Sequence, residues 1–256
     1  MRIVDAVWEK RNLGVSTAEV AIGNNDSLES FRELSRELEK AYQYVCVKCS
    51  TVVPEFLFEL QDLGYRFIET QFEIKFDRDN KAVLPSSEGL YSLYADRISF
   101  REMDDMRFDE VMGIIGEEGM FTTDRVYIDA AFPQHLAGRR YVGWCRDLKD
   151  SGSFFLEWLV NGKPVGFYEY TKTSATAWHT SLGGIYPQEN AYAFLTPAIN
   201  QKLLEYFCAQ GMKTMRSAVS SNNSVMLRLH LSVGYQISAV HYVFVRHNNL
   251  EGLAGQ

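Results

Sequence analysis

Residues 216–246 read RSAVSSNNSVMLRLHLSVGYQISAVHYVFVR, and residues 44–76 read YVCVKCSTVVPEFLFELQDLGYRFIETQFEIKF. Each stretch begins with a short apolar strand and a polar turn, continues as an amphipathic helix that ends in Gly-Tyr, and closes with an alternating strand. The two stretches align when Gly64 is set on Gly234. The same supersecondary unit therefore occurs twice, which predicts two related α/β halves in one chain.

A polar segment at residues 77–89 separates the two halves. It carries Pro85 and Gly89, a composition typical of a connection. We place the boundary near residue 88, so that residues 1–88 form the first half and residues 89–256 the second.

Hydrophobic periodicity predicts the remaining elements. In the first half we expect a strand at residues 17–22 and a helix at residues 28–42. In the second half we expect helices at residues 107–116 and 197–210, and strands at residues 98–103, 154–160, 164–171, 175–185, 213–219 and 239–246.

Glycines mark two special places among these strands. Asn161-Gly162 joins two strands and suits a type I′ turn, because both central residues of that turn take positive φ. Gly183-Gly184 lies near the end of strand 175–185, which indicates a bulge or a close backbone approach to a ligand.

The composition limits the class of protein. A chain of 256 residues with 46% apolar and 13% aromatic residues buries a sizeable core, so it is neither disordered nor fibrous. The net charge of -7 comes without a long run of one sign, and no nucleic-acid partner is expected. No apolar stretch approaches the roughly 20 residues that span a bilayer, so we expect a cytoplasmic protein without membrane contact.

Cys46 and Cys49 form the CxxC of this sequence. A zinc site would need a second ligand pair nearby, and residues three apart on a strand point to opposite faces. We therefore expect buried structural thiols and no metal site; the alternative, a metal or redox protein, requires bound metal in the purified chain.

The order of motifs in the second half resembles the GCN5-related N-acetyltransferase (GNAT) superfamily. A hairpin, a glycine-ended strand, a helix and a strand lead to Asn223, His230 and Gly234-Tyr235, and the resemblance covers about residues 98–247. It implies an α/β fold with a mixed α+β sheet, a GNAT fold preceded by an incomplete GNAT-like half. It also implies acetyl-CoA or another acyl-CoA as co-substrate.

The resemblance assigns cofactor-binding residues. In the family, the end of the glycine-containing strand presents backbone N–H groups to the thioester, and the next helix directs its N-terminus at the pyrophosphate. The glycine-rich pyrophosphate signature is absent, and residues 190–195 stand in its place. Gly184, Ile185, Tyr186 and Asn223 match the family's positions, and the resemblance also assigns to the cofactor the residues that replace the signature, namely Asn190, Ala191, Tyr192, Ala193 and Phe194.

His230 occupies the place where many GNAT enzymes carry the residue that protonates the departing thiolate. A histidine can supply that proton near neutral pH, or it can be a packed residue of an amphipathic helix. Glu169 is the general base that we select; Glu157 and His179 are alternatives, and strand carboxylates can also be solvated.

The segment 121–144 is the expected place for acceptor recognition. Its arginines and aromatic residues could hold phosphates and stack a base, or form an amphipathic helix with a solvated face: Arg125, Arg139, Arg140, Tyr141 and Trp144. The two-part layout resembles dTDP-fucosamine acetyltransferase and related sugar N-acyltransferases, which implies an amino-sugar nucleotide as one acceptor.

Two functions follow from the sequence. The first is acyl-CoA-dependent N-acetyl transfer to a primary amine of a small molecule. The alternative is a catalytically inactive GNAT-like binding or assembly module, suggested by residues 190–195. Exposed strand edges of such folds often pair, so a homodimer is the assembly to test.

Overall fold

The structure is a computed structural model that describes residues 1–80, 88–117 and 120–248. The chain begins with β1 (Arg2–Asp5), α1 (Val7–Leu13), β2 (Thr17–Ile22), α2 (Leu28–Ala41), β3 (Tyr44–Ser50), α3 (Glu55–Asp62) and β4 (Arg66–Asp77). It continues with α4 (Glu88–Tyr94), η1 (Ala95–Arg97), β5 (Ile98–Glu102), α5 (Asp105–Gly116), α6 (Arg125–Ile128), α7 (His135–Asp150), β6 (Phe154–Val160), β7 (Lys163–Lys172), β8 (Ala177–His179) and β9 (Gly183–Ile185). The last elements are η2 (Pro187–Leu195), α8 (Thr196–Ala209), β10 (Thr214–Ser220), α9 (Ser224–Ser232) and β11 (Gln236–His247).

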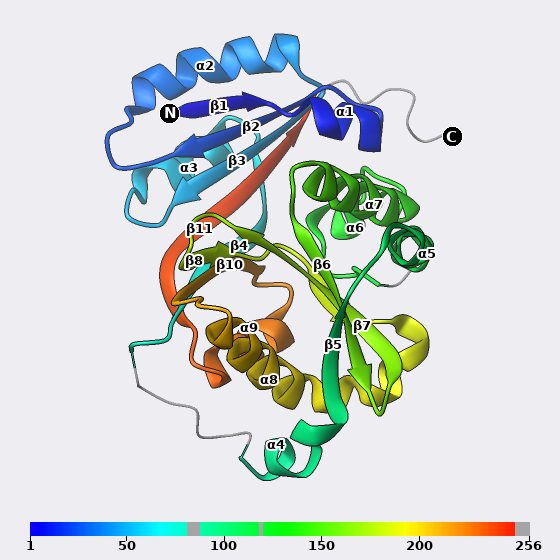
Figure 1. Ribbon diagram of the computed structural model, residues 1–256. Coiled ribbons are helices and arrows are strands. Elements are labelled where there is room, and N and C mark those ends of the chain that lie inside the picture. Colours follow the sequence, from blue (N-terminus) through cyan, green and yellow to red (C-terminus); the bar gives the residue numbers. More distant parts are fainter. Residues whose placement is uncertain (81–87, 118–119, 249–256) are drawn as a thin grey trace.

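One continuous mixed sheet runs through both halves. Its strand order is β1-β2-β3-β11-β4-β10-β8-β7-β6-β5, and β9 pairs with β7 off this path. The long strand β11 leaves the lower part of the molecule and ends in the upper part beside β3 (Figure 1). The last strand of each repeat unit therefore joins the sheet of the other half.

β4 and β11, the last strands of the two repeat units, exchange places in the sheet, and their pairings are equivalent in the two units. Met215 of β10 pairs with Phe76 of β4, and the equivalent pair in the other half is Val45 of β3 with Arg246 of β11. β4 and β11 also pair with each other, antiparallel, at the centre of the sheet. The two repeat units are thus related by a pseudo-twofold axis between their last strands.

The side chains of the exchanged strands pack into the opposite half. Phe244 of β11 is buried in the core that α2 and α3 form over β2 and β3. Its repeat equivalent, Ile74 of β4, is buried in the core under α8. Each half consequently completes its hydrophobic core with a strand from the other.

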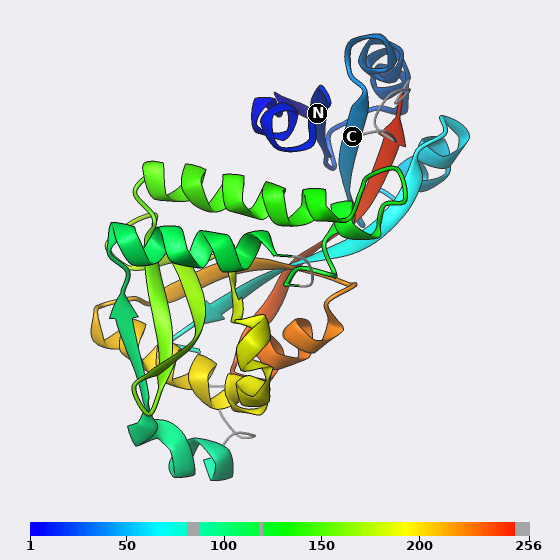
Figure 2. The ribbon, with the colours of Figure 1, turned by 90° about the vertical axis from the view of Figure 1, so that its right-hand side faces the viewer.

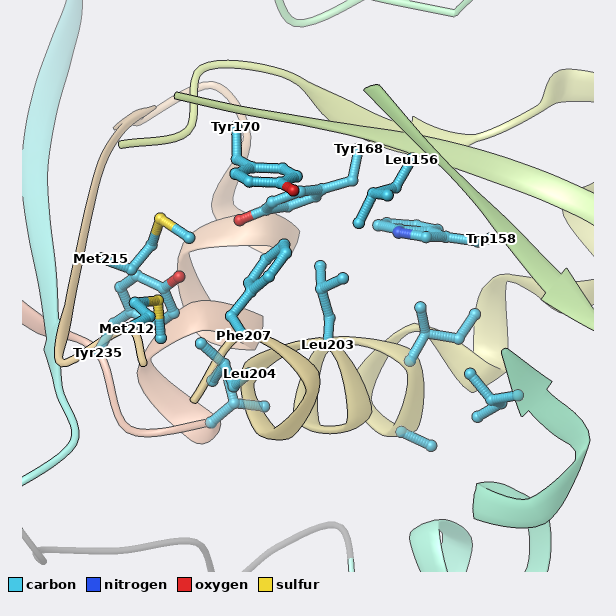
Figure 3. Packing of buried hydrophobic residues seen from close by; sticks show 14 of the residues in the cluster. Leu156, Trp158, Tyr168, Tyr170, Leu203, Leu204, Phe207, Met212, Met215 and Tyr235 are labelled. Carbon is cyan, nitrogen blue, oxygen red and sulfur yellow. The ribbon is translucent and has the colours of Figure 1, made fainter. Parts of the chain in front are cut away.

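Helices cover both faces of the second-half sheet. In Figure 2, α5 and α7 lie side by side on one face of β5, β6 and β7, and α8 lies on the other. Figure 3 shows the α8 side, where Leu203 and Phe207 point at Trp158, Tyr168 and Tyr170 on the strands. Among the described residues, no helix is long and apolar enough to cross a bilayer.

Most expected elements are present at or near their predicted bounds. The strand at residues 17–22 and the helix beginning at Leu28 are confirmed, with Ser27 as the cap that accepts from the Ser30 N–H at 3.2 Å. Asn161 and Gly162 both take positive φ, 51° and 78°, as the type I′ turn requires.

Three expectations need correction. The prediction of a single strand at residues 175–185 is wrong. β8 pairs with β10 and ends at His179, and the chain then forms a separate strand, β9, which pairs with β7. The last strand is longer than predicted and begins at Gln236. β1 and α1 were not among the expected elements. Residues 81–87 of the expected connection lie outside the described residues, and the boundary at residue 88 stays a prediction.

The exchange predicts that the two halves unfold together. Replacing Phe244 by Ala should lower the free energy of unfolding by about 3–5 kcal/mol, and Ile74→Ala by about 2–5 kcal/mol, because each leaves a cavity in a core. Urea unfolding followed by tryptophan fluorescence and by far-UV circular dichroism should give one coincident transition for both variants. The control is Phe58→Ala on α3, which removes an exposed ring and should change stability by less than about 0.5 kcal/mol. Two separate transitions would contradict the shared core.

Candidate functional site

A cavity of about 500 Å³ opens where the two halves meet. Its wall includes the edge of β10, the segment between β8 and β9, and the start of α9 from the second half. The first half contributes side chains of α1, β2, β3 and β4, and α6 and α7 complete the wall. Residues of both halves of the chain therefore form the cavity wall.

Divergence of two strands forms the floor of the cavity. β8 pairs with β10 in parallel only at Thr214–Arg216, and the Thr180 N–H donates to the Arg216 carbonyl at 2.9 Å as the final contact. Beyond this point β9 turns away with β7, and residues 217–220 of β10 keep β4 as a neighbour on one side only. The freed edges face the cavity, where backbone N–H groups can meet a ligand.

Two glycines, Gly183 of β9 and Gly166 of β7, lie where the strands pack closely. A Cβ on Gly183 would lie 2.7 Å from the Tyr168 ring, and a Cβ on Gly166 would lie 2.3 Å from the Gly184 carbonyl oxygen. These two glycines therefore allow β7 and β9 to approach closely. Gly183 lines the cavity; of the predicted cofactor residues, Gly184, Ile185 and Tyr186 do not.

Of the predicted catalytic and cofactor-binding residues, Asn223 and His230 line the cavity. Asn223 caps α9 by accepting a hydrogen bond from the Met226 N–H at 3.2 Å. His230 follows on the same helix, one turn after Met226, with 6% of its surface exposed. The helix thus brings Asn223 at its N-terminus and His230 in its last turn to the same cavity.

The hydrogen bonds of His230 define its tautomer. A carbonyl oxygen only accepts, so His230 Nδ1, 2.8 Å from the Met226 carbonyl oxygen, carries the hydrogen and donates it. Burial lowers the pKa of His230, although that hydrogen bond opposes the shift. At neutral pH the ring is neutral, and Nε2 holds a lone pair that can accept a proton.

Glu169 lies behind the cavity wall. Its carboxylate accepts hydrogen bonds from the Ser181 N–H at 2.8 Å and from the Thr171 hydroxyl at 3.0 Å, and it is fully buried. Burial raises the pKa of Glu169, and these hydrogen bonds oppose the rise. Glu169 holds the segment between β8 and β9 in place, and its role as a base stays a prediction.

Of the alternative bases, Glu157 lies on β6, away from the diverging strands, and His179 is the last residue of β8 that pairs with β10. Glu157 is fully buried and accepts from Arg107 Nε at 2.8 Å, from Arg107 Nη2 at 2.6 Å and from Arg101. Two guanidinium groups neutralise this carboxylate, so it has a structural explanation as an ion pair. His179, on β8, has its pKa lowered by burial and by Arg216.

The segment predicted to recognise an acceptor lies on the cavity wall. Arg125, Arg140, Tyr141 and Trp144 all line the cavity, whereas Arg139 donates to the Arg11 carbonyl at 3.0 Å. Both cavity arginines are more than 90% buried, and the alternative of a fully solvated face does not hold for them. The sequence reasoning missed their carboxylate partners in the first half, Glu9 and Glu19.

Glu69 and Gln71 are further cavity residues that the sequence did not indicate. Both lie on β4, and Glu69 accepts a hydrogen bond from the Ser220 hydroxyl of β10. Their approach to the second-half site requires the strand exchange. A charged residue in an alternating strand gave no separate signal.

Residues 187–195 form the 3-10 helix η2. The sequence lacks the glycine-rich signature here, and the structure accordingly has a helix in place of an open glycine turn. The Thr196 hydroxyl donates to the Ala193 carbonyl at 2.6 Å, and Lys163 pairs with Glu189 at 2.6 Å. The predicted pyrophosphate residues, Asn190, Ala191, Tyr192, Ala193 and Phe194, do not line the cavity. Contact of η2 with the pyrophosphate of a cofactor stays a prediction.

The two cysteines of the CxxC lie in different surroundings. Cys49 packs in the core under α2 and α3, and Cys46 lies near Arg125 and Glu19. Burial raises the pKa of both thiols, that of Cys49 to about 11. The described residues contain no cluster of three or more His, Cys, Asp or Glu that could hold a metal ion.

Comparison with known proteins finds similarity at the level of structure. No protein-family model matches the sequence, and no curated protein does. A functionally unknown conserved protein from Staphylococcus epidermidis superimposes with a TM-score of 0.56 at 11% identity, covering 91% of this chain and 84% of that one. A tandem GNAT protein from the clavulanic acid biosynthesis pathway gives 0.54 at 11% identity, with 91% and 75% covered. A GCN5-related N-acetyltransferase from Kribbella flavida gives 0.52 at 12% identity, with 93% and 83% covered.

The lowered pKa of His230 predicts an acid-sensitive fold. Below the unfolded-state pKa of about 6.5 the unfolded chain binds the proton more readily than the folded chain, so stability falls as the pH falls. His230→Leu, which copies Leu60 of the first repeat, should remove this part of the loss between pH 7 and pH 5. Urea unfolding at both pH values measures it. Equal losses in the wild type and the variant would contradict the assignment.

Proposed function

Because the chain has the fold of the GCN5-related N-acetyltransferases, we propose that it transfers an acetyl group from acetyl-CoA to a primary amine of a small molecule. The observation that supports this most is the divergence of β9 from β10 beside Asn223 and His230. Such an opening admits a thioester between two freed strand edges. A cytoplasmic location and a homodimer belong to the same proposal.

The chain's own residues can hold the acetyl donor in two places. Gly183 lines the cavity at the strand break, where its backbone N–H can face the thioester oxygen. Asn223 and the first turn of α9 offer an amide and the positive end of a helix dipole. When bound, acetyl-CoA supplies an activated acyl group with a thiolate leaving group.

His230 is suited to move the proton of the reaction. A neutral amine nitrogen attacks the thioester carbonyl carbon, the N–C bond forms and the C–S bond breaks. His230 Nε2 accepts the proton that the nitrogen loses and returns it to the departing thiolate. One histidine with a bare Nε2 can therefore act as base first and as acid second. Glu169 stays a candidate base that would act through the Ser181 segment.

A catalytically inactive binding or assembly module is the second candidate. The 3-10 helix at residues 187–195, which stands in place of a glycine-rich turn, favours it. This candidate predicts no response to acetyl-CoA.

Asn223→Ala provides the first test of the transferase. The variant should lose about 1 kcal/mol of stability with the helix cap. It should also bind acetyl-CoA about threefold to tenfold more weakly in isothermal titration, because one ligand hydrogen bond is lost. Ser27→Ala, which removes an equivalent cap from α2 outside the cavity, is the matched control and should lose stability only. Absence of heat with acetyl-CoA and with free CoA at millimolar concentration would favour the inactive module.

Ala193→Asp separates the two candidates at η2. Ala193 is exposed, so a carboxylate there is tolerated by the fold. If η2 contacts the pyrophosphate, like-charge repulsion should abolish acetyl-CoA binding while the midpoint of urea unfolding stays unchanged. Unchanged affinity would remove η2 from the cofactor site.

A further inference from the structure

Three buried polar atoms on the cavity wall lack hydrogen-bond partners among the described residues. They are Glu9 Oε2, Asn12 Nδ2 and Arg125 Nε, and all three residues line the cavity. Buried polar groups in folded proteins are nearly always paired, because leaving one unpaired costs about 1–3 kcal/mol. One acceptor atom and two donor atoms at this wall therefore have no hydrogen-bond partner among the described residues.

One carboxylate oxygen of Glu9 is hydrogen-bonded and the other is not. Its Oε1 accepts from Arg140 Nε at 2.7 Å and lies 3.5 Å from Arg125 Nη2, while the residue is fully buried. Two guanidinium groups thus keep the carboxylate in one orientation. Oε2 is left to accept from a donor that the cavity admits.

Asn12 is held by close packing of two helices. α1 packs against α7, and a Cβ on Gly143 of α7 would lie 2.3 Å from Asn12 Oδ1. The amide therefore lies directly on the α7 backbone and is 3% exposed. Nδ2 lies against the same glycine, 2.9 Å from that Cβ position.

The charges around these atoms leave an excess of negative charge. Arg125 pairs with Glu19 at 2.9 Å, and Arg140 pairs with Glu9 and, at 3.2 Å, with Asp124. Three carboxylates thus face two guanidinium groups. Burial opposes ionisation of Glu19, yet Arg125 and the other nearby cations lower its pKa, so it stays charged.

The neighbouring cavity residues do not reverse this balance. Lys48 and Glu69 add one charge of each sign, and Asp147 is paired with Arg11 at 2.5 Å. A ligand with one positive charge would neutralise the wall. A phosphate would add like charge beside Asp124 and Glu9, where the arginines are already paired.

We propose that Glu9, Asn12 and Arg125 form the acceptor subsite and that it takes a cationic amine with hydroxyl or similar acceptor groups and without phosphate. This inference rests on the proposed acetyl transfer. The cationic group donates to Glu9 Oε2, and the acceptor groups receive hydrogen bonds from Arg125 Nε and Asn12 Nδ2. An amino-sugar nucleotide, with its diphosphate, does not suit this wall.

The test compares two matched pairs of amines by isothermal titration with the full chain at low ionic strength. The pairs are glucosamine with its phosphate ester and ethanolamine with its phosphate ester, and N-acetylglucosamine is the neutral reference. Each cationic member should bind at least tenfold more tightly than its phosphate ester and than the neutral sugar. Stronger binding of the phosphate esters, or no binding of either cation, would overturn the subsite.

Variants locate the binding. Glu9→Gln should weaken binding of the cations by about tenfold or more, since it removes a charge-assisted hydrogen bond. Glu110→Gln is the control, an exposed carboxylate paired with Arg107 outside the cavity, and should leave the affinity unchanged. If Glu9→Gln fails to fold, the partly exposed Glu19→Gln lowers the same negative charge and should weaken the cations severalfold. Equal affinities in the variant and wild type would refute the assignment.

Acetyl-CoA titrated into the same samples distinguishes the two proposals. Cation binding without acetyl-CoA binding would remove the transferase and keep the subsite. Acetyl-CoA binding with transfer to the phosphate esters in preference would keep the transferase and remove the subsite.

Discussion

The pairing of β4 with β10 and of β11 with β3 is the interaction on which the rest of the structure depends. It places Phe244 and Ile74 in the cores of opposite halves, so neither half has a complete core of its own. Because backbone hydrogen bonds and apolar burial both cross the boundary, the relative position of the halves is set by the sheet and does not depend on the connecting segment. A cavity between the halves can then have walls as rigid as a domain interior.

The site arises where this exchange meets a break in the second-half sheet. Pairing with β10 ends after β8, at Thr180, and β9 pairs with β7 instead. β4 brings Glu69 to the opposite edge of β10. α1 of the first half adds Glu9 and Asn12 by packing on α7. The first half thus contributes part of the cavity wall and the second half the rest, which gives a physical reason for the two to remain in one chain.

Buried charge distinguishes the two sides of the cavity. The wall at α1, α6 and α7 holds arginines and carboxylates in a desolvated network, where each charge keeps its partner because an unpaired one would be costly. The wall at β10 and α9 holds a neutral histidine, the N-terminus of a helix and unpaired strand edges. The two walls therefore differ in charge, since one holds buried ion pairs and the other a neutral imidazole.

The sequence alone determined the repeat, the Asn161-Gly162 hairpin, the apolar face of α8 and the placement of Asn223 and His230 on one helix. These depend on local periodicity, turn geometry and spacing, and the mixed α/β fold of the acetyltransferases is confirmed from them. Only the tertiary structure decided which copy of each repeat strand pairs with which half. The two copies carry the same alternation of apolar residues, so β4 satisfies β10 as well as β11 would, and no local signal separates the two pairings. The recruitment of Glu9, Asn12 and Glu69 follows from that choice, because residues so distant along the chain meet only once the sheet is assembled.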